Sequence, residues 1–179
     1  MHNNQSTNKS QGQFIFLDCT RYDLNDHITI LGCTLWSHIP PTASEMVGHY
    51  LNDFRKIQQW SVEEHNSAHF ANAQWLDCEC AKIRSEEPKR QIVIFTHYAP
   101  TFQGTIAPKH VNSLINSGFA TDMTTRPCWG HPVSHWVFGH THFNCDFMQN
   151  SVRVLSNQRG YEGSEASHSQ FWEQFVLHL

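Results

Sequence analysis

The sequence predicts an α/β fold, and two features of the chain support this prediction. Short aliphatic runs recur along the chain, and a long stretch with helical spacing of apolar residues lies between them, from residue 61 to residue 87. Strand-to-helix order of this kind is typical of helices layered on a sheet. We therefore expect one domain in which the ends of several strands meet at one edge of the sheet, and 179 residues are enough for such a core.

Two neighbouring strands are expected first. Residues 1–12 are mostly Asn, Gln, Ser and Lys and cannot bury enough apolar surface to order themselves, so they are predicted to form a disordered tail. Phe14–Leu17 and Ile28–Leu31 are apolar runs on either side of an Asp/Asn-rich turn. The turn between them predicts that these two strands pair.

Two helices are expected next, each marked by a capping box. Thr42 precedes a glutamate by three residues and predicts a helix to about Ile57. Ser61 stands in the same relation to a glutamate and predicts a second helix. This helix must end at Glu87, because Pro88 cannot continue it.

The second half of the chain is predicted to be mainly strands. A short helix is expected from Pro108 to Gly118, where glycine suits the C-terminal cap. The expected strands, of which the last two form a hairpin, cover residues 91–96, 134–138, 143–148 and 152–156. We place the domain at residues 13–161, followed by a linker and terminal segment at 162–179. Residues 171–179 fit a helical stripe, while residues 175–179 also alternate as a strand does.

The charge and composition exclude several classes of function. With a net charge of −4 and only 12 Lys and Arg residues, the chain lacks the basic surface that binds duplex nucleic acid. The charge of any bound phosphate would therefore have to be neutralised by metal. None of the six cysteines forms a Cys-x-x-Cys pair, and no apolar signal segment is present in residues 1–13. The apolar runs are far shorter than a membrane span. We expect a soluble, cytoplasmic protein with reduced thiols and no membrane partner.

Three histidines follow predicted strands. His97 comes directly after strand 91–96, and His140 and His142 follow strand 134–138 and Gly139. Ligands gather at the carboxyl ends of strands in α/β sheets, and neutral imidazole is the commonest metal ligand. One histidine at such a place is ordinarily a loop or core residue. Three at strand ends predict a metal site.

The motifs around these histidines resemble those of the calcineurin-like metallophosphoesterases. The similarity covers Phe14 to Tyr161 and includes the sequences Thr96-His97-Tyr98-Ala99-Pro100, Gly139-His140-Thr141-His142-Phe143, Gly32 to Ser37, the helix with Trp60 and Trp75, and Ser156 to Tyr161. The resemblance implies an αββα sandwich and a hydrolase acting on phosphomonoesters or phosphodiesters. It further implies two divalent ions (Mn, Fe or Zn) that activate the attacking water. By resemblance, His97 and His140 bind one ion and His142 binds the other.

The chain lacks the first three motifs of that family. No Asp-x-His, Gly-Asp-x-x-Asp or Gly-Asn-His occurs, and the early acidic residues Asp18, Asp23 and Asp26 stand in no such pattern. The similarity is therefore to the C-terminal half of the fold. We expect an incomplete dinuclear site with no assigned catalytic residue, and a missing N-terminal half as a partner alongside the phosphate-ester substrate. The alternative is a non-catalytic remnant or binding module with one structural zinc.

Further candidate residues have both a functional and an ordinary interpretation. Tyr98, Thr105 and Arg159 could bind substrate, although the first two could equally be loop residues and the arginine could pair with a carboxylate. His65 and His69 have the spacing of a zinc pair on a helix, but position 66 is Asn where a metalloprotease needs Glu, so a packed or solvated helix face is expected. The structural-zinc alternative would use the cluster Cys128, His131, His135, His140, His142 and Cys145.

Overall fold

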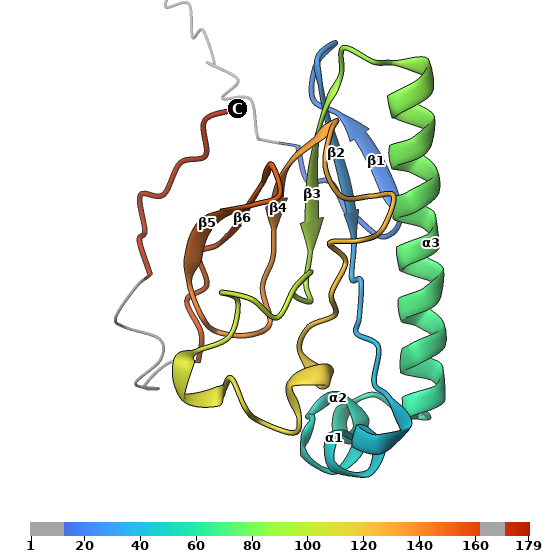
Figure 1. The fold of residues 1–179 in the computed structure, drawn as a ribbon, viewed down its shortest axis with the longest axis vertical. Coiled ribbons are helices and arrows are strands. Elements are labelled where there is room, and N and C mark those ends of the chain that lie inside the picture. The colour runs from blue at the N-terminus through green and yellow to red at the C-terminus, as the bar shows by residue number, and fades with distance from the viewer. Residues whose placement is uncertain (1–12, 162–170) are drawn as a thin grey trace, which may run out of the picture.

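The chain folds around one mixed sheet. A computed structural model describes residues 13–161 and 171–179, and in it six strands lie in the order β1-β2-β3-β4-β6-β5 with one long helix along the sheet (Figure 1). The pairs β2·β3, β3·β4 and β4·β6 are parallel, and the edge strands β1 and β5 are antiparallel to their neighbours. The strands are β1 Thr20–Asp23, β2 Ile28–Cys33, β3 Gln91–Thr96, β4 Val133–Val137, β5 Cys145–Gln149 and β6 Val152–Ser156. The predicted α/β class is confirmed.

The long helix α3, Val62–Glu86, forms the core with the sheet. Ser61 caps it as predicted, because its Oγ accepts from the Glu64 amide while its own amide donates to the Glu64 carboxylate. The helix ends before Pro88. Its buried residues Ala73, Leu76, Cys80 and Ile83 pack in one cluster with strand residues such as Leu31, Ile92, Ile94 and Trp136.

The hairpin β5–β6 is confirmed, whereas the first predicted strand is wrong. The strand that pairs with β2 is Thr20–Asp23, and Phe14–Leu17 forms no strand. Pairing runs outward from the turn and ends at Thr20 opposite Gly32. Because β2 ends at Cys33, residues 14–17 have no strand opposite them, and Phe14 is 87% exposed.

The single helix predicted from Thr42 to Ile57 is also wrong. The structure has a 3₁₀ turn at Pro41–Ala43, α1 at Ser44–Tyr50 and α2 at Asp53–Lys56. Leu51 is extended between them and buried in a small cluster with Ile39 and Val47. Burial of this leucine outweighs continuation of the helix, and Thr42 makes no cap.

The predicted helix from Pro108 to Gly118 is reduced to two 3₁₀ turns, at Pro108–His110 and Asn116–Gly118. The side-chain amide of Asn116 donates to the carbonyls of His110 (2.8 Å) and Val111 (2.9 Å). These bonds compete with the main-chain bonds of a continuous helix, which is why asparagine favours turns.

The predicted tail at 1–12 and most of the predicted linker, residues 162–170, lie outside the described residues. The terminal residues 171–179 form neither helix nor strand, and the Asn157 side chain bonds the main chain of Trp172. No helix in the described parts of the chain is long and apolar enough to cross a membrane. The αββα sandwich implied by the resemblance stays a prediction.

Candidate metal centre

The carboxyl ends of the parallel strands bring the predicted histidines to one edge of the sheet. β3 ends at Thr96 and is followed by His97, and β4 ends at Val137, three residues before His140. Strands β2 and β3 run toward the end of the molecule where α1 and α2 lie (Figure 1). Segments far apart in the sequence therefore converge here, as expected for parallel strands.

His97 and His140 face one another. The His97 Nε2 and the His140 Nδ1 are 3.2 Å apart, and the His140 Nε2 lies 3.3 Å from the carbonyl of Gly118. If the His140 Nε2–H donates to that carbonyl, Nδ1 keeps its lone pair on the side of His97. A second nitrogen held by a backbone carbonyl is the usual arrangement of a metal-ligating histidine.

Both rings of this pair favour the neutral state that metal ligation requires. Desolvation, together with the neighbouring His97, lowers the pKa of His140 to about 4. His97 keeps part of its surface exposed, and desolvation of the remainder also lowers its pKa. Neither ring therefore holds a second proton at neutral pH.

The main chain around the pair is strained. His140 and His142 have positive φ values of 66° and 52°, which residues with a Cβ seldom adopt. Between the two strand ends, the Gly139 amide donates to the His97 carbonyl at 3.0 Å. A Cβ on Gly139 would stand 3.3 Å from the His97 Nδ1, so glycine permits this close approach. Strain of this kind concentrates at functional sites.

A carboxylate that sequence analysis missed lies beside the pair. Tyr98 is completely buried, its ring lies 4.1 Å from that of His140, and its hydroxyl donates to the Asp53 carboxylate. Burial and this carboxylate raise the pKa of Tyr98, and the Asp53 charge acts on both imidazoles in the direction of a higher pKa. Asp53 begins α2, and no motif in the sequence marks it.

The segment after β2 is held to this edge by side chains of α3. Leu35 and Trp36 have positive φ values of 69° and 52°. Three alternate amides of the segment donate to α3 side chains: Leu35 to Asn72 (2.9 Å), Ser37 to His65 (3.1 Å) and Ile39 to Asn66 (2.8 Å). His69 bonds the Leu35 carbonyl. His65 and His69 are therefore packed helix residues, as expected.

Among the described residues, the other predicted positions add no third metal ligand to the pair. The ring of His142 lies against that of Tyr161, with centroids 4.6 Å apart. Tyr98 and Thr105 are completely buried, and Thr105 donates to the carbonyl of Thr101, so neither side chain lines an open substrate surface. Arg159 is exposed after β6.

The six members of the Cys/His cluster are not gathered into one site. Cys128 is buried in the main core, where desolvation raises its pKa. Cys145 lies 3.7 Å from the Ser156 hydroxyl, and desolvation by burial raises its pKa to about 11. All six cysteines of the chain are unpaired. Within residues 13–161 and 171–179, no three His, Cys, Asp or Glu side chains are placed to hold a metal ion together.

The His97–His140 pair nevertheless fits as part of a ligand set. Two nitrogen ligands at 2.0–2.1 Å from a tetrahedral ion stand about 3.3 Å apart. The observed separation of 3.2 Å is close to this value. Two imidazoles supply no negative charge, so the described residues alone do not fit a complete two-ion centre.

Comparison with known proteins gives few similarities. No family model matches the chain. A search of curated proteins finds uncharacterized protein L509 of Acanthamoeba polyphaga mimivirus, 28% identical over 154 residues, or 78% of this chain and 52% of the viral protein. The crystal structure of phosphopantetheinyl hydrolase from Mycobacterium tuberculosis matches with a TM-score of 0.44 and 15% identity, covering 84% of this chain and 59% of that one. The chain thus spans about half the length of the curated relative it matches.

Proposed function

We propose that this chain supplies the histidine ligands of a metal-dependent phosphoesterase centre. Such a centre hydrolyses a phosphomonoester or phosphodiester. The observation that supports this most directly is the separation of 3.2 Å between the His97 Nε2 and the His140 Nδ1, both on neutral rings at neighbouring strand ends. Bound divalent ions would supply activation of water and neutralisation of the phosphate charge.

The chain's own residues have distinct parts in this proposal. His97 and His140 hold one ion, and the Gly118 carbonyl orients the second ring. Tyr98 packs on His140 and ties it to Asp53. His142 belongs to the second ion, in keeping with the resemblance. The carboxylates needed to bridge and balance two ions come from outside the described residues.

Metal content tests the ligand assignment. The chain is dialysed against Mn²⁺ or Zn²⁺ and analysed by plasma emission. We expect weak binding, below two ions per chain, and less in His97→Ala, while His27→Ala, which changes an exposed residue of the β1–β2 turn, binds as the wild type does. Metal that survives His97→Ala but is lost in Cys128→Ala and Cys145→Ala would instead establish the structural-zinc module.

Hydrolysis tests the activity itself. In a polypeptide extended by the three absent motifs, manganese-dependent hydrolysis of an aryl phosphate or aryl phosphodiester should rise above background. His140→Ala and His142→Ala should each abolish it, because each removes a ligand of a different ion. A completed chain that binds two ions yet hydrolyses neither ester would be a non-catalytic binding module.

A further inference from the structure

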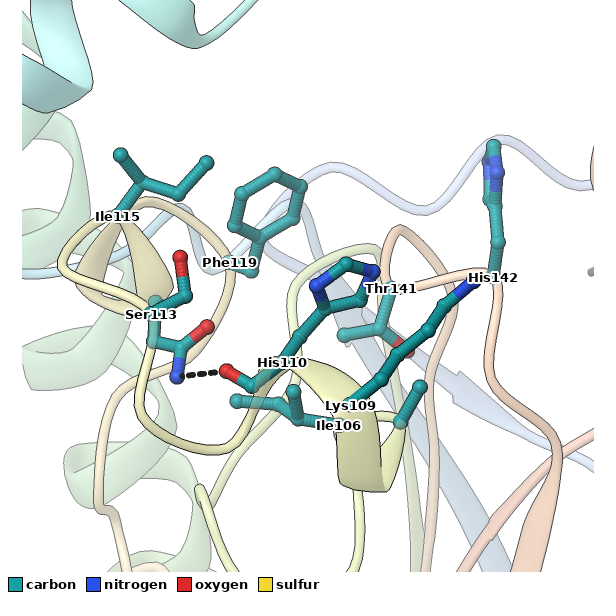
Figure 2. Close-up of a pocket in the computed structure, with 10 residues that line it drawn as sticks. Ile106, Lys109, His110, Ser113, Ile115, Phe119, Thr141 and His142 are labelled. Atoms are coloured by element: carbon teal, nitrogen blue, oxygen red, sulfur yellow. Dashed lines mark hydrogen bonds between the residues drawn. The ribbon is translucent and has the colours of Figure 1, made fainter.

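A cavity of about 280 Å³ opens beside the candidate metal centre. It lies between the loop of residues 106–119 and the turn formed by Thr141 and His142 (Figure 2). The ring of Phe119, which forms part of its wall, lies 4.9 Å from the ring of His140. The cavity and the imidazole pair therefore share a wall.

The two sides of the cavity differ in chemistry. Ile115 and Phe119 make an apolar side, while Ile106 lies beside Lys109 (Figure 2). On the other side, Lys109 and His110 reach toward the turn with Thr141 and His142 (Figure 2). None of the ten described lining residues is acidic. An apolar wall facing a cation, with no carboxylate to compete, fits an organic anion.

The rim of the cavity, formed by residues 109–116, is held in place by its own hydrogen bonds. The Ser113 amide donates to the carbonyl of His110 at 2.9 Å, and the Asn116 side chain donates to the same carbonyl at 2.8 Å. These bonds fix the turn from which Lys109 and His110 project. A rim that is already formed loses less entropy when a ligand binds.

We propose that this cavity binds the organic group of the phosphate ester, an aryl group or one of similar size and polarity. The organic group packs on Ile115 and Phe119, and the Lys109 ammonium meets the phosphoryl oxygens at the His142 end. This inference rests on the proposed function, since it identifies the substrate class of the same site. The cavity, and not the metal ions, then selects among phosphate esters.

The test uses phenylphosphonate, which is not hydrolysed, and the wild-type chain in EDTA. Titration followed by amide nuclear magnetic resonance should give saturable shifts at Phe119, Thr141 and His142. Methylphosphonate should bind at least about tenfold more weakly, the equivalent of about 55 Å² less apolar surface buried. Lys109→Gln should weaken phenylphosphonate binding about fivefold, the upper end for an exposed ion pair.

Two further variants complete the design. Lys89→Gln changes an exposed lysine in the turn between α3 and β3, where it lines a different cavity, and should bind as the wild type does. Ser113→Phe places a ring in the proposed cavity and should weaken phenylphosphonate binding while leaving methylphosphonate binding unchanged.

Three results would overturn the proposal: equal affinity for the two phosphonates, no effect of Lys109→Gln, or equally tight binding of benzoate, which would identify a carboxylate site. Because no metal is present, failure here leaves the ligand role of His97 and His140 intact. Conversely, failure of the metal experiment leaves phenylphosphonate binding as a separate property of the cavity.

Discussion

Acid should destabilise this protein through His65, which is completely buried. Its ring packs among Trp36, Phe54 and Tyr98, with centroids 5.3–5.5 Å away. Its Nε2 accepts from the Ser37 amide, a bond that only the neutral ring can accept. Desolvation lowers the pKa of His65 to about 4.

The magnitude follows from this pKa. The fall from the ordinary value of 6.5 to about 4 corresponds to about 3 kcal/mol at roughly 1.4 kcal/mol per pH unit. Below about pH 6.5 the unfolded chain binds a proton at His65 that the folded chain does not. The contribution of neutral His65 to the free energy of unfolding is therefore fully present above this pH. It declines as the pH falls toward about 4 and changes no further below that pH.

The assay is urea unfolding at several pH values between about 7.5 and about 4.5. His65→Gln keeps an acceptor for the Ser37 amide but cannot titrate, so its free energy of unfolding should decline with acid by about 2–3 kcal/mol less than that of the wild type. Other buried histidines, including His140, act equally in both chains and cancel. His27→Gln is the matched control and should follow the wild type. Parallel curves for wild type and His65→Gln would refute the reasoning.

Two further changes test the strand ends and the long helix. Gly139→Ala should reduce divalent metal binding, because its Cβ would stand 3.3 Å from the His97 Nδ1 and displace the ring. Its free energy of unfolding should stay within about 1 kcal/mol of the wild-type value. Equal metal content in the dialysed variant and wild type would contradict this. Ser61→Ala should lower the free energy of unfolding in urea by about 1 kcal/mol, because α3 loses its cap. Ser67→Ala, further along the same helix, should lower it by less. Equal losses of stability in the two variants would show that the cap contributes nothing of its own.

Elements with local boundary signals were predictable from the sequence. α3 has a capping box at Ser61 and a proline after its end, so both ends are set by neighbouring residues. β3 was predicted with its observed bounds from an apolar run ending at His97. The hairpin β5–β6 was marked by its turn, where Asn150 and Ser151 adopt the positive φ that such turns require.

Elements that depend on distant contacts were not predictable. Thr20–Asp23 is a polar sequence and becomes β1 only because the turn registers it against β2. The break between α1 and α2 depends on burial of Leu51 with Ile39, a contact that helical periodicity does not contain. Propensity is a weak prior, and tertiary packing overrides it.

The candidate site also has residues that the sequence predicts and residues that it does not. The sequence placed His97, His140 and His142 at strand ends, and the structure brings the first two together. His142 has a positive φ of 52° and its ring lies against Tyr161, and no local sequence pattern predicts this backbone conformation. Asp53 reaches the pair through Tyr98 from a helix predicted with the wrong length.

The hydrogen bonds from α3 to residues 35–39 also affect how the molecule meets other chains. A segment outside a sheet ordinarily leaves main-chain amides free, and a strand of another molecule can pair with them. Here Leu35, Ser37 and Ile39 donate to side chains of α3 instead. Side chains of α3 thus accept the hydrogen bonds that a neighbouring strand would otherwise accept. While α3 stays folded, these three amides cannot pair with a strand of another molecule.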